Sequence, residues 1–252
     1  MEQAGLYALA AFIVGMSKGG LATAGALAVP ILSLWMDPLT AAAYLLPIYI
    51  ISDVVGVYLY RHDYSRPNLM VLIPAGLVGV IVATLVAPYL AASVAKFLTG
   101  MIGVVYCVQA FLRAWRGTVE PRPFVAWRGM IWGTLAGITS FISHNGGPPF
   151  QAFVLPQKLP KLAFAGTTTI TFAAINLFKL PAYGAVGLMA GFDWKTTTWM
   201  AAVAVAGAVV GRRLTVILPD RVYITFIQVT LFLISIYLVG EALVSWLGRA
   251  GG

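Results

Sequence analysis

The sequence is poor in charge. Only 10% of its 252 residues are charged, whereas a soluble domain carries roughly 25%. No charged side chain occurs from Pro67 to Ala95, nor, with a neutral His144, from Gly129 to Gln157. Each stretch is longer than the ~20 residues that cross a hydrocarbon core. A soluble protein is therefore excluded, and we expect a polytopic membrane protein.

Cysteine and histidine are also scarce, with one Cys and two His in the chain. A single Cys107 can form no intramolecular disulfide, and this set is too small for a plausible metal site. The residue types of a hydrolytic triad occur in Ser140, Ser143, His144 and Asp53, but Ser143 and His144 are adjacent and do not face each other on a helix. We therefore expect no cofactor, no metal and no enzymatic activity.

The apolar runs that fill the sequence predict an all-α fold made of two repeats. Residues 1–114 form the first repeat, 115–127 a cytoplasmic connector and 128–252 the second repeat. Each repeat should contain a broken helical hairpin followed by three transmembrane helices. In the first repeat the hairpin covers 5–36 and the helices cover 39–60, 68–87 and 93–114; in the second the hairpin covers 129–155 and the helices cover 161–180, 194–210 and 223–246.

Matching residues support this repeat: Gly19-Gly20 with Gly146-Gly147, Pro30 with Pro156, Asp53 with Asn176, and Gly79 with Gly207. The charges indicate its orientation. If each broken run crossed the membrane once, the repeats would be parallel and the basic residues would divide between both faces. If each is a hairpin, the second repeat is inverted and most Lys and Arg lie on one face, except Lys96, Lys195 and Arg249. The positive-inside rule favours inverted repeats with both termini outside.

Two short polar, glycine-rich breaks interrupt the apolar runs, Ser17-Lys18-Gly19-Gly20 and Ser143-His144-Asn145-Gly146-Gly147. Non-helical backbone in a bilayer must be buried in protein or line a watery cavity, and matched breaks in two halves indicate a transporter binding site. Helix N-termini at such breaks suit an anion. The candidate substrate-binding residues are Ser17, Lys18, Gly19, Gly20, Thr23, Ser143, His144, Asn145, Gly146 and Gly147, with a possible hydroxyl from Ser140. The alternative for Lys18 is snorkelling to an interface.

Further polar residues inside the spans are candidates for proton coupling or support of the site. Asp53 is costly in lipid unless it is paired or protonated, so it is expected to neutralise Lys18 in the empty state or to carry a proton; its alternative is a packing hydrogen bond. Asn176 occupies the equivalent place in the second repeat, and His144 is a further candidate for the proton. Lys179 is included as well, although its position predicts a place near the outer surface.

The patterns Gly79-x-x-x-Ala83 and Gly207-x-x-x-Gly211 let helices approach closely. We expect them to pack within the bundle, with a homodimer contact as the alternative. The net charge of +8 does not indicate nucleic acid, because the basic residues lie in short clusters between apolar runs.

Several motifs resemble the sulfite exporter TauE/SafE family: Gly137 to Ser140, His144 to Pro149, Leu155 to Leu159, Gly166-Thr167, and Asn176 with Lys179. The resemblance covers nearly the whole chain. It implies a multi-pass permease of the bacterial inner (plasma) membrane for sulfite, sulfoacetate or another organosulfonate, and it implies proton coupling. The first break, Lys18-Gly19-Gly20, contains a shorter run of glycines than the corresponding break in many relatives.

We therefore expect a secondary transporter whose partners are a small anionic substrate and the lipid bilayer. A passive anion channel is the main alternative. A membrane anchor for another protein is disfavoured, because an anchor does not need glycine-broken hairpins at matched positions.

Overall fold

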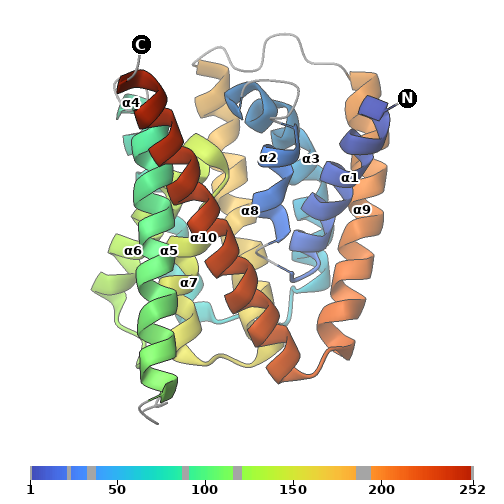
Figure 1. The fold of residues 1–252 in the computed structure, drawn as a ribbon. Helices are drawn as coiled ribbons and strands as arrows, with labels where there is room; N and C mark the ends of the chain where they lie inside the picture. The colour runs from blue at the N-terminus through green and yellow to red at the C-terminus, as the bar shows by residue number, and fades with distance from the viewer. Residues whose placement is uncertain are drawn as a thin grey trace.

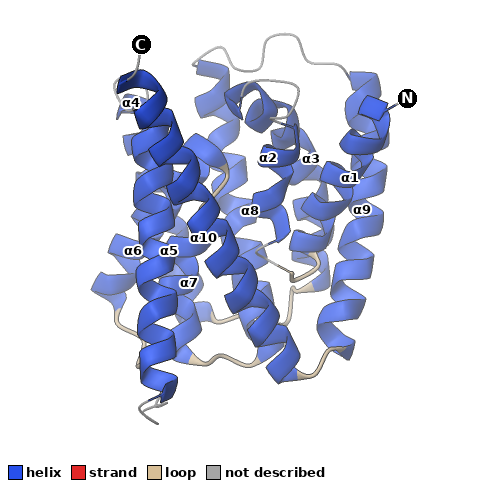
Figure 2. Ribbon diagram, viewed as in Figure 1, coloured by secondary structure: helices blue, strands red, loops and turns tan. Residues whose placement is uncertain are grey.

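The computed structural model describes residues 2–21, 24–32, 38–86, 91–115, 121–185 and 194–250. Every regular element in these ranges is a helix (Figure 2), so the predicted all-α class is confirmed for them. The elements are α1 (Glu2–Lys18), η1 (Ala24–Leu27), α2 (Ala28–Leu32), α3 (Pro38–Leu59), α4 (Arg66–Val86), α5 (Ala92–Trp115), α6 (Ala126–Ser143), α7 (Gly147–Val154), η2 (Leu155–Gln157), α8 (Lys161–Ala185), α9 (Trp194–Ile217) and α10 (Asp220–Ala250).

Five helical stretches in the described residues are long and apolar enough to cross a membrane: Ala41–Leu59, Arg66–Val86, Lys161–Ala185, Lys195–Ile217 and Asp220–Leu247. A shorter apolar stretch, Lys96–Val108, lies in α5, and another, Ala4–Lys18, lies in α1. Length and composition thus indicate a multi-pass membrane protein.

Both expected breaks are present, and each begins slightly later than its polar motif. α1 continues through Ser17 and Lys18, and the chain turns at Gly20 with a φ of 116°. α6 ends at Ser143, and His144 caps it in the left-handed conformation with a φ of 53°. Glycine adopts positive φ without strain, which explains Gly20 at the first turn.

Several helices extend beyond their predicted ends. α9 runs to Ile217 and so includes Arg212 and Arg213. α8 continues through Pro181 to Ala185, past its predicted end at residue 180. The predicted end is therefore wrong: Tyr183 is fully buried, and packing outweighs the helix-breaking tendency of proline in a membrane bundle. Residues 186–193 lie outside the described ranges.

The most extensive helix pairs join the two halves of the chain. α1 packs on α9, α6 packs on α4, and α5 packs on α10 (Figure 1). Glycines make this close approach possible: a Cβ at Gly79 would lie 2.2 Å from the Thr134 carbonyl oxygen, and one at Gly207 would lie 2.3 Å from that of Phe12. The expected packing role of these two glycines is therefore confirmed. The start of α1 and the end of α10 lie at the same end of the bundle (Figure 1).

Candidate functional site

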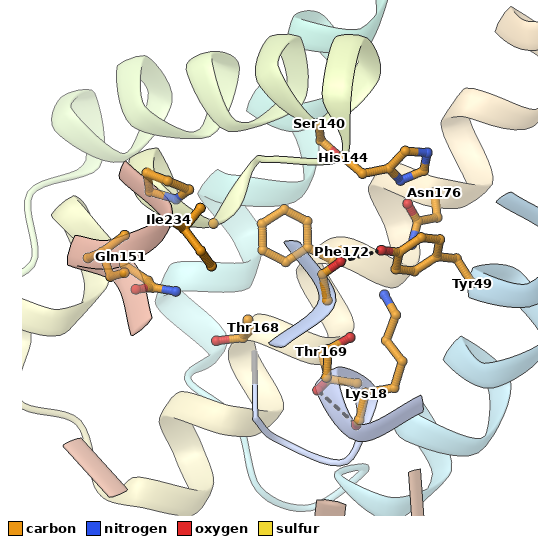
Figure 3. A pocket seen from close by; sticks show the side chains of 15 residues that line it. Lys18, Tyr49, Ser140, His144, Gln151, Thr168, Thr169, Phe172, Asn176 and Ile234 are labelled. Atoms are coloured by element: carbon orange, nitrogen blue, oxygen red, sulfur yellow. Dashed lines mark hydrogen bonds between the residues drawn. The ribbon is translucent and has the colours of Figure 1, made fainter. Parts of the chain in front are cut away.

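A cavity of about 50 Å³ lies between the two breaks (Figure 3). A single water occupies roughly 10–15 Å³ on this measure, so the space suits a few waters or one small oxyanion. Its lining includes Ser17 and Lys18 of α1, Tyr49 of α3, Ser140 of α6, His144, Gly147 and Gln151 around and within α7, and Thr168, Thr169, Phe172 and Asn176 of α8.

Lys18 supplies a positive charge to this cavity. Its ammonium group lies 2.7 Å from Asp53 Oδ1 and 4.8 Å from the centre of the Tyr49 ring. Asn176 Nδ2 donates to the other Asp53 oxygen at 2.8 Å. The two residues that the repeat pairs, Asp53 and Asn176, therefore meet in space, and Lys18 is ion-paired inside the protein rather than snorkelling to an interface.

Lys179 supplies a second buried ammonium group, which contacts Ser140 and His144. Its side chain is 0% exposed, so the expectation that it lies near the outer surface is wrong. Its ammonium donates to the carbonyl oxygen and the hydroxyl oxygen of Ser140, both at 3.2 Å, and lies 3.0 Å from His144 Nδ1. The sequence did not predict this burial, because the partners that hold Lys179 are Ser140 of α6 and His144 at its C-cap, more than 30 residues earlier in the chain.

The buried charges do not balance. In the described part of the chain, the buried ionisable side chains of Lys, Arg, Asp and Glu are Lys18, Lys179 and Asp53. With all three groups ionised, two ammonium groups and one carboxylate leave one excess positive charge in the protein interior. A buried charge is costly unless it is paired, so the site is electrostatically suited to a small anion.

Gly19 and Gly20 pack tightly at the first bend and do not line the cavity. A Cβ at Gly19 would lie 2.3 Å from the Ala208 carbonyl oxygen, and one at Gly20 would lie 2.3 Å from Tyr60 Oη. Neither glycine is among the residues that line the cavity. Their close packing against α9 and Tyr60 fixes the position of Lys18 beside them. Thr23 lies outside the described residues.

His144 links the second bend to the core. Its Nε2 lies 3.1 Å from the Ala42 carbonyl oxygen, so Nε2 carries the proton and Nδ1 accepts from Lys179. The ring stacks on Tyr49 with centroids 4.8 Å apart. Because both ring nitrogens have protein partners, His144 orients Lys179 and Tyr49 rather than presenting a free nitrogen to the cavity.

The remaining residues of the second bend divide between packing and the cavity. Gly147 lines the cavity. Gly146 is packed tightly, since a Cβ there would lie 2.5 Å from the Phe172 ring. Asn145 is buried, and its Oδ1 has no hydrogen-bond partner among the described residues. The side chain of Ser143 is not among those that the structure describes.

The sequence reasoning missed Gln151, Tyr49 and the paired threonines Thr168-Thr169. Gln151 is 0% exposed and lines the cavity. Its position in an uncharged apolar run was the available signal, because polar side chains inside spans are costly and mark functional sites. Tyr49 gave no comparable signal, since tyrosine is common in membrane helices.

In the described residues, no group of three His, Cys, Asp or Glu side chains is placed to hold a metal.

Comparison with known proteins agrees with this picture of the chain. The family model described as sulfite exporter TauE/SafE matches residues 7–238, which is nearly the whole length. No curated protein and no solved structure matches the chain significantly.

Proposed function

The chain belongs to the sulfite exporter TauE/SafE family of membrane transporters, and we propose that it is a secondary transporter that carries a small sulfur-containing oxyanion across the bacterial inner membrane by alternating access. Sulfite, sulfoacetate and other organosulfonates are the candidate substrates. Membership in a transporter family agrees with the expectation of a non-enzymatic protein.

The unbalanced buried charge carries this proposal. Lys18 and Lys179 are buried together with Asp53, the one buried carboxylate among the described residues, and an anion in the cavity would cancel the excess positive charge. The cavity lies between two broken hairpins, where non-helical backbone in transporters forms substrate sites.

The helix pairing supports a repeat of two equivalent halves. The pair α1–α9 corresponds to α6–α4 when the two halves are exchanged, and α5–α10 and α3–α8 each correspond to themselves. Such an exchange is what a pseudo-twofold axis between the halves produces. With the basic connections on the cytoplasmic side, the two hairpins enter from opposite faces. Relative rocking of the halves would then expose the cavity to each side in turn.

Asp53 is the group that we propose couples protons to transport. An incoming anion competes with Asp53 for the Lys18 ammonium. Once that ion pair weakens, the buried carboxylate is left with Asn176 as its remaining neutral partner, and protonation relieves the cost of its charge. Anion and proton would then move together.

Transport by purified protein in liposomes tests the proposal. We expect saturable uptake of labelled sulfite or sulfoacetate that accelerates when the same unlabelled anion is present on the opposite side. A passive channel would give no such trans-stimulation. Absence of uptake for every sulfur oxyanion would contradict the proposal.

Lys18 offers a sharp variant with a matched control. The double variant Lys18→Met/Asp53→Asn removes both charges of one ion pair and so leaves no buried carboxylate unpaired. We expect it to insert normally but to lose anion binding. Lys96→Met removes a lysine that pairs with Glu241 between α5 and α10, away from the residues that line the cavity, and should bind the anion normally.

Asp53→Asn tests the coupling separately. Asparagine keeps the shape and can still bond Asn176, but it cannot take up a proton. We expect counterflow of the anion to persist while accumulation driven by a pH gradient disappears. Proton-driven accumulation in the variant would remove Asp53 from the mechanism.

A further inference from the structure

Gln151 brings an unused amide to the cavity. It lies on α7, one helical turn after Gly147, and its side chain is 0% exposed. Neither its Nε2 nor its Oε1 has a hydrogen-bond partner among the residues that the structure describes. Figure 3 draws it on the opposite side of the Phe172 ring from Lys18 and Tyr49. A buried amide without partners is costly, so this group is suited to a ligand that offers both an acceptor and a donor.

The hydroxyl groups around the cavity also favour a ligand with a donor. Ser17 donates to the Val14 carbonyl oxygen at 2.7 Å, and Tyr49 donates to that of Gly25 at 2.9 Å. Thr168 donates to Phe164 and Thr169 donates to Lys18, at 2.8 and 3.2 Å. Since a hydroxyl has one hydrogen, these four oxygens present only lone pairs to the cavity. The Ser140 hydroxyl oxygen accepts from Lys179.

A fully deprotonated oxyanion fits such a lining poorly. Its oxygens accept hydrogen bonds and offer none, so they would face the Gln151 carbonyl oxygen and the four hydroxyl oxygens without a hydrogen between them. Before Asp53 takes up a proton, the interior with both lysines ionised holds one excess positive charge, which matches an entering anion with a single negative charge better than one with two.

We propose that the site selects an oxyanion that carries one negative charge and an O–H group, and that Gln151 determines this selection. Its Nε2 donates to an oxygen of the anion while its Oε1 accepts from the ligand's hydroxyl. The inference rests on the proposed transport function and assigns a ligand class to the same cavity. The hydroxyl belongs either to the oxyanion itself or to a short carbon substituent.

Three small monoanions at one mildly acidic pH separate these cases by isothermal titration of the purified protein. Hydrogensulfite carries its hydrogen on the oxyanion, hydroxymethanesulfonate carries a hydroxyl on carbon, and methanesulfonate has no O–H. We expect the wild-type protein to bind at least one of the first two about 10-fold more tightly than methanesulfonate, which corresponds to one or two net hydrogen bonds. The tighter of the two identifies the source of the hydroxyl.

Gln151→Leu should abolish this preference while it leaves the melting temperature of the ligand-free protein unchanged or higher, because it removes a partnerless amide. Gln157→Leu is the matched control: Gln157 exchanges two hydrogen bonds with Asn68 outside the cavity, and its loss should leave the preference intact. A retained preference in Gln151→Leu overturns the inference, as does a lower melting temperature with equal weakening of all three ligands. If the wild-type protein binds none of the three, the inference fails, and uptake of labelled sulfoacetate into liposomes then decides whether the proposed function fails with it.

Discussion

At the first bend, hydroxyl groups from three other parts of the chain bind two consecutive carbonyl oxygens, whereas the second bend keeps a buried polar atom without a partner among the described residues. The Gly19 oxygen accepts from Tyr60 and Thr215, and the Gly20 oxygen accepts from Tyr223. At the second bend, Asn145 Oδ1 is buried without a partner among the described residues. The two bends share a polar, glycine-rich sequence, but their surroundings differ.

The difference indicates a division of roles between the bends. The first bend carries its own cation, Lys18, on a backbone that is tied to α9 and α10. The second bend carries no lysine or arginine and obtains its positive charge from Lys179 of α8 through His144. It is followed by α7, which supplies the neutral amide of Gln151. We infer that the first hairpin supplies charge and the second supplies hydrogen-bonding selectivity.

The two lysines provide the largest test of this comparison. Lys18→Met leaves Asp53 buried without its cationic partner, which should lower the free energy of unfolding by about 3–5 kcal/mol. Lys179→Met leaves only neutral acceptors unpaired, so we expect a loss of about 1–2 kcal/mol. Both variants should bind the anion weakly. Unfolding in mixed micelles and titration with sulfite measure the two effects, and equal stability losses would contradict the assignment of charge pairing to the first bend.

Gly20 and Gly147, which the repeat places in corresponding motifs, provide the second largest test. Gly20→Ala would place a Cβ 2.3 Å from Tyr60 Oη at a φ of 116°, and overpacking together with strain should cost about 2–4 kcal/mol. At Gly147 the nearest atom to a Cβ is Gln151 Nε2 at 3.6 Å, an ordinary contact, so Gly147→Ala should fold normally. Thermal unfolding in detergent compares the two; similar melting temperatures would show that the bends are equally tolerant.

Tyrosine hydroxyls give the smallest test. Tyr60→Phe removes one of the donors to the Gly19 oxygen, while Thr215 remains, so the free energy of unfolding should fall by about 0.5–1 kcal/mol. Tyr183→Phe removes a donor to the Phe141 oxygen near the second bend, a bond of 2.6 Å, and serves as the counterpart. We expect neither variant to alter anion affinity by more than about twofold. A large loss of binding in Tyr60→Phe would show that the first bend is held less firmly than its contacts indicate.

Much of the architecture follows from local properties of the sequence. Long uncharged runs require membrane helices, and a polar glycine-rich motif within such a run requires a protected break; both rules concern neighbouring residues. The repeat also placed Asp53 and Asn176 at equivalent positions, and they meet in the structure at 2.8 Å.

The ends of the helices were less accessible to this reasoning. Pro181 was expected to end a helix, because proline disfavours helix locally, yet α8 continues to Ala185. The buried Tyr183 that follows it binds the Phe141 carbonyl oxygen, and such a distant contact is invisible in a local pattern.

The amino-acid sequence by itself determined the membrane class, the two breaks, and Lys18 and Asp53 as charges that must be paired or used. Only the tertiary structure decided that Lys179 is buried against Ser140 and His144, that Gln151 has no partner among the described residues, and that the hydroxyls of Tyr49 and Thr169 donate to distant carbonyl oxygens. The reason is physical: burial and hydrogen-bond partners are set by helices that pack across the two halves of the chain, and sequence spacing does not specify that packing.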